Sequence, residues 1–166
     1  MGNRATVIFT DGNTNHSPAV YLHWNGGPES VYGFLEELDR RGVRADQDYE
    51  CARFIQIVGE FFDSDGQDGL SLGVANGPAA QAISPETLRT VMTDHGDNGF
   101  YIVNRTVSPC AVRRFFEVEG GNLVEAPPEK VERERREAET DAYRPEFRKF
   151  YQALAASRTA SGKKSH

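Results

Sequence analysis

Residues 4–38 read RATVIFTDGNTNHSPAVYLHWNGGPESVYGFLEEL and predict two strands followed by a helix. Residues 4–10 and 19–24 are rich in β-branched and aromatic side chains, which is typical of strands. The turn-forming sequence DGNTNHSP lies between them, so the stretch predicts a β-hairpin. NGGP at 25–28 ends the second strand, and Pro28 suits the first position of a helix. That helix has an apolar face at i, i+3, i+4 and i+7, formed by Val31, Phe34, Leu35 and Leu38.

A second helix is predicted over residues 49–63, because apolar side chains recur there at helical spacing for three turns. Ser84-Pro85-Glu86 is a good helix entry, and Leu88, Val91 and Met92 give that third helix an apolar side. Further strands are predicted at 70–77, 100–104, 111–119 and in LVEA at 123–126. This order predicts an α+β fold, with a largely antiparallel sheet, two amphipathic helices packed on one face, and a C-terminal helical extension.

Length and composition indicate one globular domain with an appendage. The chain has 166 residues, of which 38% are apolar, and no apolar run is long enough to span a membrane. The first residues lack the apolar stretch of a signal peptide, and two cysteines cannot form a disulfide scaffold. We therefore expect a cytoplasmic protein without a membrane association.

Charge divides the chain into an acidic body and a mildly basic end. Residues 1–126 hold 9 basic and 18 acidic side chains, whereas residues 127–166 hold 10 basic and 7 acidic ones. We predict an acidic α+β domain over 1–126, a charged helical extension over 127–156 and a disordered tail over 157–166. The acidic body is not expected to bind duplex nucleic acid, because such binding requires Lys or Arg to neutralise several phosphates.

The extension has two parts. Residues 126–143 have almost no apolar face, so they predict a solvated helix or a spacer. An apolar face returns after Pro145, formed by Phe147, Phe150, Tyr151 and Leu154. This last helix either docks on the body or binds a partner, which includes a second copy of the chain in a homodimer.

The densest acidic stretch is 36–68, with ten acidic side chains and four arginines. It predicts either a solvated face or a surface that meets basic side chains of a protein partner. For the second case the predicted partner-binding residues are Glu36, Glu37, Asp46, Asp48, Asp63 and Asp65, together with Phe147, Phe150 and Tyr151 of the last helix.

The common catalytic motifs for phosphate, dinucleotide, serine-hydrolase and zinc chemistry are absent, and no cofactor is expected. The sequence DHGDNG at 94–99 favours a helix C-terminus with a capping His and turn-forming Asp, Asn and Gly. The alternative is a metal or acid–base site of Asp94, His95 and Asp97, with Asp11 and His23 as further ligands. DSDGQDG at 63–69 resembles a calcium loop but lacks the Gly at position 6 and the Glu at position 12 that such a loop requires, which favours a polar turn. Cys51 falls on an apolar helix face, and Cys110 has no neighbour that would activate its thiol.

The most distinctive sequence is YLHWNGGPESV at 21–31, which contains the single tryptophan. His23, Trp24 and Asn25 predict a rigid strand-to-helix corner, with Trp24 packed beneath it and His23 hydrogen-bonded. The alternative is a ligand or partner contact built on His23 and Asn25.

Residues 4–35, and within them this His-Trp-Asn-Gly sequence, resemble the start of small uncharacterised proteins from phages and integrative elements. The resemblance transfers no catalytic residue. It implies an origin on a mobile element, where small acidic proteins often bind host proteins, including defence nucleases.

Together these features predict a non-catalytic, protein-binding protein that inhibits a host nucleic-acid-handling complex through its acidic surface, its C-terminal helix or both. The partner would carry a basic, nucleic-acid-binding surface. The alternative is a small metal-dependent hydrolase or nuclease that uses the His/Asp site.

Overall fold

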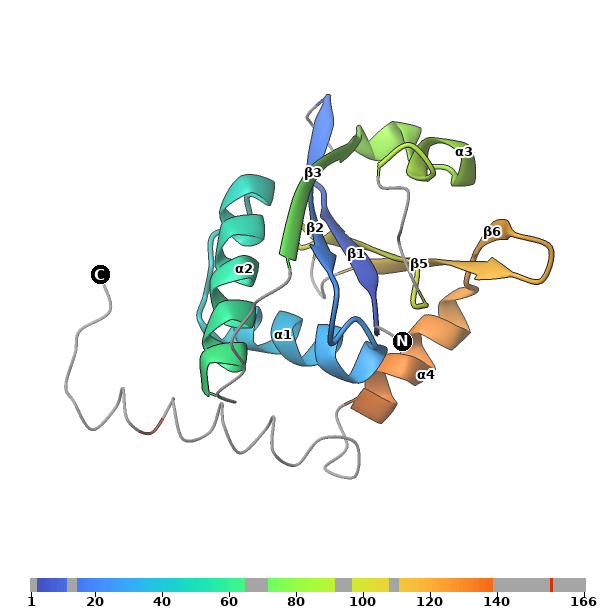
Figure 1. Cartoon of the computed structure of the whole chain (residues 1–166). Coiled ribbons are helices and arrows are strands. Elements are labelled where there is room, and N and C mark those ends of the chain that lie inside the picture. Colours follow the sequence, from blue (N-terminus) through green and yellow to red (C-terminus); the bar gives the residue numbers. More distant parts are fainter. Residues whose placement is uncertain are drawn as a thin grey trace.

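A six-stranded mixed sheet forms the centre of the molecule (Figure 1). The computed structural model describes residues 3–11, 15–64, 72–91, 97–107, 111–138 and 156. The strands, in spatial order, are β3 (Leu72–Pro78), β2 (His16–Leu22), β1 (Ala5–Phe9), β4 (Phe100–Asn104), β5 (Ala111–Val118) and β6 (Asn122–Glu125). β1 and β4 run parallel, and all other neighbouring strands are antiparallel. With the helices, this sheet confirms the predicted α+β class and its largely antiparallel character.

The predicted hairpin is present as β1 and β2, but β2 begins and ends earlier than predicted. Its first residue, His16, lies opposite Pro78 of β3, and its last residue, Leu22, lies opposite Leu72. The residues before Ala19 have turn-forming side chains, and pairing with β3 overrides that local preference. His23 and Trp24 therefore lie beyond the strand.

Helices α1 (Pro28–Arg40) and α2 (Gln47–Ser64) contribute to one of the two core clusters. Pro28 occupies the first turn of α1, and Gly42 follows the helix with a φ of +66°, which an L side chain rarely adopts. The rings of Phe34 and Phe54 lie 5.7 Å apart, and Phe54 also contacts Phe9 of β1 at 5.3 Å. The apolar faces predicted from the sequence of these helices are thus buried against β1, β2 and β4.

A second core cluster lies on the other face of the sheet, where Leu88 packs with Ile8, Phe100 and Phe115. Leu88 belongs to α3 (Pro85–Leu88), which follows a short 3-10 turn, η1 (Ala80–Ala82). The predicted capping residue, Ser84, accepts a hydrogen bond from the Thr87 amide.

The third helix is shorter than predicted. After Leu88 the backbone hydrogen bonds join residues three apart: the Thr90 amide donates to the Thr87 carbonyl, and the Val91 amide donates to the Leu88 carbonyl. The Thr90 hydroxyl also donates to the Thr87 carbonyl, a local bond that competes with the helical ladder. Met92, which was predicted to extend the apolar side, lies outside the described residues.

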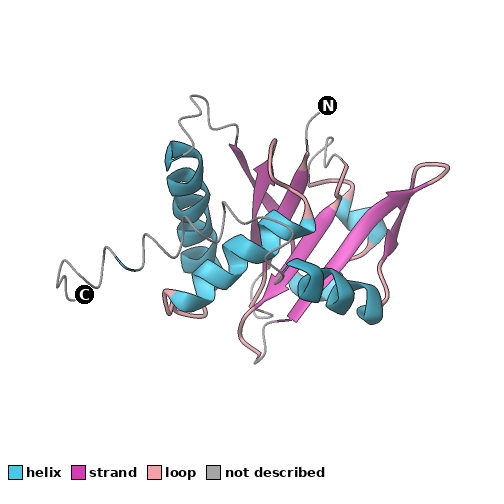
Figure 2. Cartoon of the chain, turned by 90° about the horizontal axis from the view of Figure 1, so that it is seen from below, coloured by secondary structure: helices cyan, strands magenta, loops and turns pink. Residues whose placement is uncertain are grey.

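The last described helix, α4 (Pro128–Ala138), lies beside α1 and is the first part of the predicted extension (Figure 2). No residue of α4 is fully buried, as its charged composition predicts. It is not a spacer, however, because Val131 and Ala138 pack against the core and Lys130 lies 4.1 Å from the ring centre of Phe116. In the described ranges, no helix is long and apolar enough to cross a membrane.

Candidate functional site

The acidic stretch 36–68 carries its own counter-charges in the folded protein. Glu37 is buried, and its carboxylate binds Arg40 at 2.6 Å and Arg41 at 2.7 Å. Arg41 also pairs with Glu60 of α2. Burial alone would raise the pKa of Glu37, but the hydrogen bonds from the two arginines outweigh it and lower the pKa. Glu37 is therefore a structural residue and is not available to a partner.

Two further carboxylates share Arg105, which follows β4. The Nη2 atom of Arg105 lies 2.6 Å from Asp39, and its Nη1 atom lies 3.3 Å from Glu50. Glu50 is almost fully buried, and this burial raises its pKa to about 7 even though Arg105 acts in the opposite direction. Local sequence does not distinguish Glu50 from the other polar residues of α2, because its burial depends on segments distant in the chain.

The other predicted acidic residues do not form a continuous surface. Asp46 accepts hydrogen bonds from the Asp48 and Tyr49 amides at the start of α2 and lies 3.5 Å from Arg44. Asp48 is exposed. The side chain of Asp63 and all of Asp65 lie outside the described part of the structure.

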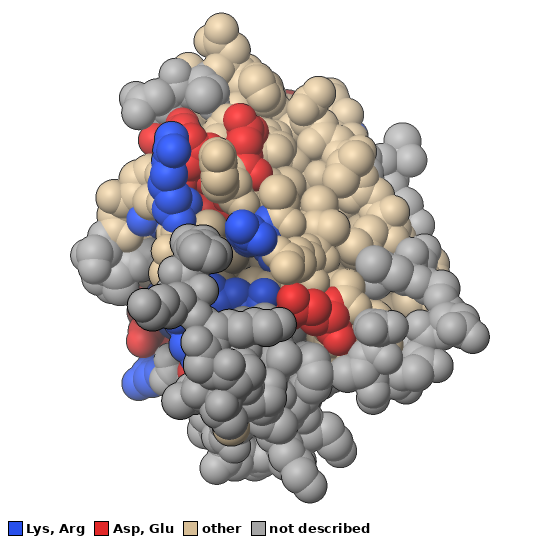
Figure 3. Space-filling model, turned by 90° about the vertical axis from the view of Figure 1, so that its left-hand side faces the viewer, with Lys and Arg blue, Asp and Glu red and all other residues tan. Residues whose placement is uncertain are grey.

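The surface view agrees with this pairing. On the side that α2 covers, Figure 3 shows acidic and basic side chains next to one another among many uncharged ones. Arginines thus neutralise most of the described carboxylates of the stretch, and only Glu36 and Asp48 have no ion pair with a described residue.

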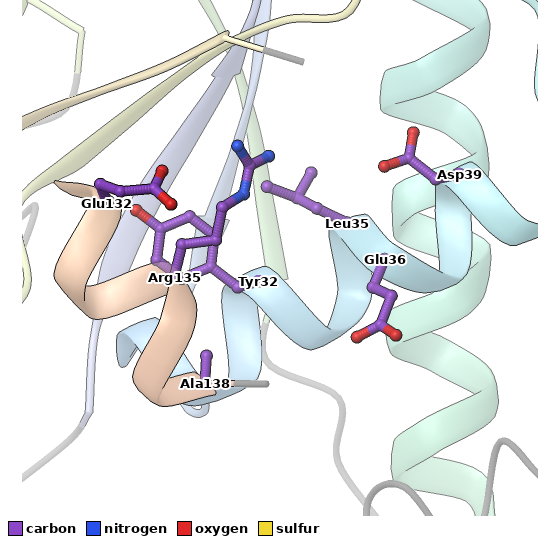
Figure 4. Close-up of a pocket in the computed structure, with 7 residues that line it drawn as sticks. All are labelled: Tyr32, Leu35, Glu36, Asp39, Glu132, Arg135 and Ala138. Atoms are coloured by element: carbon purple, nitrogen blue, oxygen red, sulfur yellow. The ribbon is translucent and has the colours of Figure 1, made fainter. Parts of the chain in front are cut away.

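A pocket of about 330 Å³ opens between α1 and α4. We call it the α1–α4 groove, and it is lined by Tyr32, Leu35, Glu36, Asp39, Glu132, Arg135 and Ala138 (Figure 4). Its volume falls within the range of binding pockets, which is roughly 300–1,000 Å³. Glu36 and Asp39 come from α1 and Glu132 from α4, so carboxylates are present on both helices.

The apolar part of the groove consists of Leu35, Ala138 and the ring of Tyr32. Arg135 extends from α4 across this ring, with its guanidinium carbon 5.9 Å from the ring centre (Figure 4). The Tyr32 hydroxyl is buried and has no hydrogen-bond partner among the described residues. Burial raises its pKa well above the usual value, so the hydroxyl keeps its proton and can donate. A buried polar group of this kind is satisfied when a ligand supplies an acceptor or donor.

Glu36 and Glu132 are exposed and form no ion pair with another described residue. Asp39 is shared with Arg105, and Arg135 is the single basic side chain that lines the groove. The groove therefore combines an apolar floor with an excess of negative charge, an arrangement suited to an amphipathic, basic ligand.

The predicted strand-to-helix corner is present, but Trp24 is not packed beneath it. The Trp24 side chain is 42% exposed and contacts His23 edge-to-face at 4.9 Å between ring centres. His23 is hydrogen-bonded as predicted, with Nδ1 lying 3.3 Å from the Tyr21 hydroxyl. Asn25 has a φ of +61°, in the left-handed region, which turns the chain between the end of β2 and the start of α1.

The corner is held by close backbone contacts at Gly26. A Cβ atom there would lie 2.7 Å from Ala5, and the Gly26 carbonyl accepts a hydrogen bond of 2.9 Å from the Tyr101 hydroxyl. The Gly26 amide in turn donates to the Asn3 carbonyl at 2.7 Å.

The described part of the alternative metal site does not come together. Asp11 and His23 lie at opposite ends of β1, because His23 follows the strand that runs antiparallel to it. Asp97 pairs with Arg4 at 3.8 Å, while Asp94 and His95 lie outside the described ranges. Within those ranges, no group of three or more His, Cys, Asp or Glu residues could hold a metal ion.

The remaining candidates are a buried cysteine and segments outside the described structure. Cys51 is buried as predicted, which raises the pKa of its thiol to about 11, so it is a core residue. Cys110 and most of the predicted polar turn at 63–69 lie outside the described residues. Phe147, Phe150 and Tyr151 of the predicted partner-binding helix do so as well.

Comparisons with known proteins identify no relative. No family model, no curated protein and no solved structure matches this chain.

Proposed function

We propose that this protein is a non-catalytic binding protein whose α1–α4 groove receives a basic, amphipathic helix of a protein partner. The observation that carries this proposal is the pocket between α1 and α4, where the carboxylates of Glu36 and Glu132 flank an apolar floor. Helix-in-groove recognition uses this combination, since the apolar face of the ligand enters the groove and its charged face meets the rim.

The groove replaces the wider acidic surface as the proposed contact. The ion pairs of Glu37, Asp39 and Glu60 with arginines engage these carboxylates within the described part of the stretch 36–68. Exposed acidic groups that are already paired attract a basic partner only weakly. Of the predicted residues, Glu36 lies on the groove itself and Asp48 lies on α2 at the surface.

A partner that uses the same basic segment to bind nucleic acid would be inhibited by this binding. The proposed role is therefore consistent with a protein of a mobile element that blocks a host nucleic-acid-handling complex. That setting is what the resemblance of residues 4–35 implies, and it is part of the proposal. The metal-dependent hydrolase remains the second hypothesis, and no observation on the described residues favours it.

The test measures binding of the full chain to a labelled 14-residue helical peptide with Leu on one face and Lys on the other. We expect the affinity to fall as the salt concentration rises, because salt ions screen the attraction between the exposed rim carboxylates and the lysines of the peptide. The double substitution Glu36→Lys and Glu132→Lys should weaken it by about tenfold or more, through like-charge repulsion.

The matched control is Asp48→Lys with Glu119→Lys. It changes the net charge by the same amount at two exposed positions that do not line the groove. Equal losses of affinity in the two double variants would show that only net charge matters and would contradict the proposal. A peptide with Glu in place of Lys should not bind.

A further inference from the structure

We propose that residues 144–154 of this chain are themselves a ligand of the α1–α4 groove, so that the C-terminal segment competes with a protein partner for it. This inference rests on the proposed function, because it assigns the same groove. It adds a named occupant and a means by which the chain regulates access to its own binding surface.

The first reason is where the described chain ends. Ala138 is the last residue of α4, and it lines the groove. Residues 139–166 follow in the sequence, outside the described ranges apart from residue 156. Each residue spans up to roughly 3.3–3.6 Å, so the five residues 139–143 are long enough to lead the chain back beside α1.

The second reason is charge. Residues 144–154 read RPEFRKFYQAL, in which Arg144, Arg148 and Lys149 stand against one acidic residue. The groove has the opposite balance, with three carboxylates and Arg135. A basic segment held next to an acidic groove by a short connection has a high effective concentration there, so even weak contacts lead to occupancy.

The third reason is the pattern of apolar side chains. Phe147, Phe150, Tyr151 and Leu154 occur at i, i+3, i+4 and i+7, which places them on one face if the segment is helical. Such a face matches the floor formed by Leu35 and Tyr32. The buried Tyr32 hydroxyl lacks a hydrogen-bond partner within the described ranges and so offers a further polar contact to an occupant.

The test is hydrogen exchange of the full chain, read by mass spectrometry on peptides that cover residues 144–156. If the segment occupies the groove, its amides are protected, and the Glu36→Lys/Glu132→Lys variant exposes them with exchange at least about tenfold faster. The Asp48→Lys/Glu119→Lys control should leave their exchange unchanged. Combining the groove variant with Arg148→Glu and Lys149→Glu should restore protection by reversing both charges.

Unchanged exchange in the groove variant would overturn the inference, provided that β1 and β4 keep their protection and so report an intact fold. If the protection of these amides rises with protein concentration, the groove is occupied by the segment of a second copy. That result would also overturn the inference. The exchange experiment needs no partner, so its failure is separable from failure of the proposed function.

A second measurement uses a variant outside the described body. Phe147→Ser with Phe150→Ser removes apolar contacts of the proposed occupant and leaves every groove residue intact. The Leu/Lys peptide should then bind the full chain about fivefold more tightly or better, because an internal competitor has been removed. Equal affinity of wild type and variant, where both bind the peptide, contradicts the internal competition while leaving the proposed function in place.

Discussion

Arg114 of β5 and Glu134 of α4 form an ion pair that joins the last described helix to the sheet. Their Nη1 and Oε2 atoms lie 2.6 Å apart, and the two side chains are only 5% and 15% exposed. Arg114 also lies over the ring of Tyr101, 4.0 Å from its centre, and donates to the Asn98 carbonyl at 2.7 Å. One wall of the α1–α4 groove therefore depends on this pair.

We expect Glu134→Ala to lower the free energy of unfolding by about 3 kcal/mol, because it leaves a buried guanidinium without its carboxylate. The control is Glu125→Ala, which removes the partner of the neighbouring Arg113. That pair is 46% and 43% exposed, so its loss should cost less than about 1 kcal/mol. Denaturant unfolding measures both values, and similar losses would argue against a structural role for the buried pair.

Glu50 should make stability fall as pH rises from about 4.5 to 7, since its pKa is raised from 4.5 to about 7 in the folded protein. In this window the folded state binds more protons at Glu50 than the unfolded state does. The stability that protonated Glu50 contributes is therefore fully present below pH 4.5, and it is lost as the pH rises through 7. Glu50→Gln should remove this dependence, which amounts to up to about 3 kcal/mol.

The measurement for Glu50 is the free energy of unfolding of wild type and variant at four pH values between 5 and 8. Glu37→Gln provides the opposite case, because the pKa of Glu37 is lowered by its arginines. The stability that ionised Glu37 contributes is present above pH 4.5, and it is lost as the pH falls through the lowered pKa. Parallel pH profiles for wild type and Glu50→Gln would show that Glu50 titrates normally.

Gly26→Ala should destabilise the strand-to-helix corner by about 2 kcal/mol or more, because the new Cβ would lie 2.7 Å from Ala5. Gly42→Ala is the comparison. No atom lies within 4 Å of its added Cβ, although its φ of +66° is unfavourable for alanine. We expect a loss of about 1 kcal/mol there. Thermal unfolding distinguishes the two, and a larger loss at Gly42 would contradict the close contact at Gly26.

Trp24→Ala should change the free energy of unfolding by less than about 1 kcal/mol, since the side chain is 42% exposed and surface substitutions have small effects. Trp24 is the single tryptophan of the chain, so intrinsic tryptophan fluorescence reports on it alone. Acrylamide should quench this fluorescence in the folded protein nearly as well as in the unfolded one. Strong protection from quenching would mean that Trp24 is covered.

The candidate site was only partly predictable. Glu36 was identified from the acidic stretch, and it lines the groove. Glu37, its neighbour in the sequence, is buried, because on a helix adjacent residues face different directions. Arg135 and Tyr32 meet across two helices that are far apart in the chain, so no local pattern links them.

Local periodicity in the sequence determined the hairpin, the apolar faces of α1 and α2 and the α+β class. These features depend on side chains within a few residues of one another, whose alternation or helical spacing can be read directly. Three features could be established only from the folded chain: the parallel pairing of β1 with β4, the ion pair of Asp39 with Arg105 and the docking of the charged helix α4 on α1. Each of these joins segments distant in the sequence, where the energy of a contact depends on burial and geometry that the folded chain alone creates.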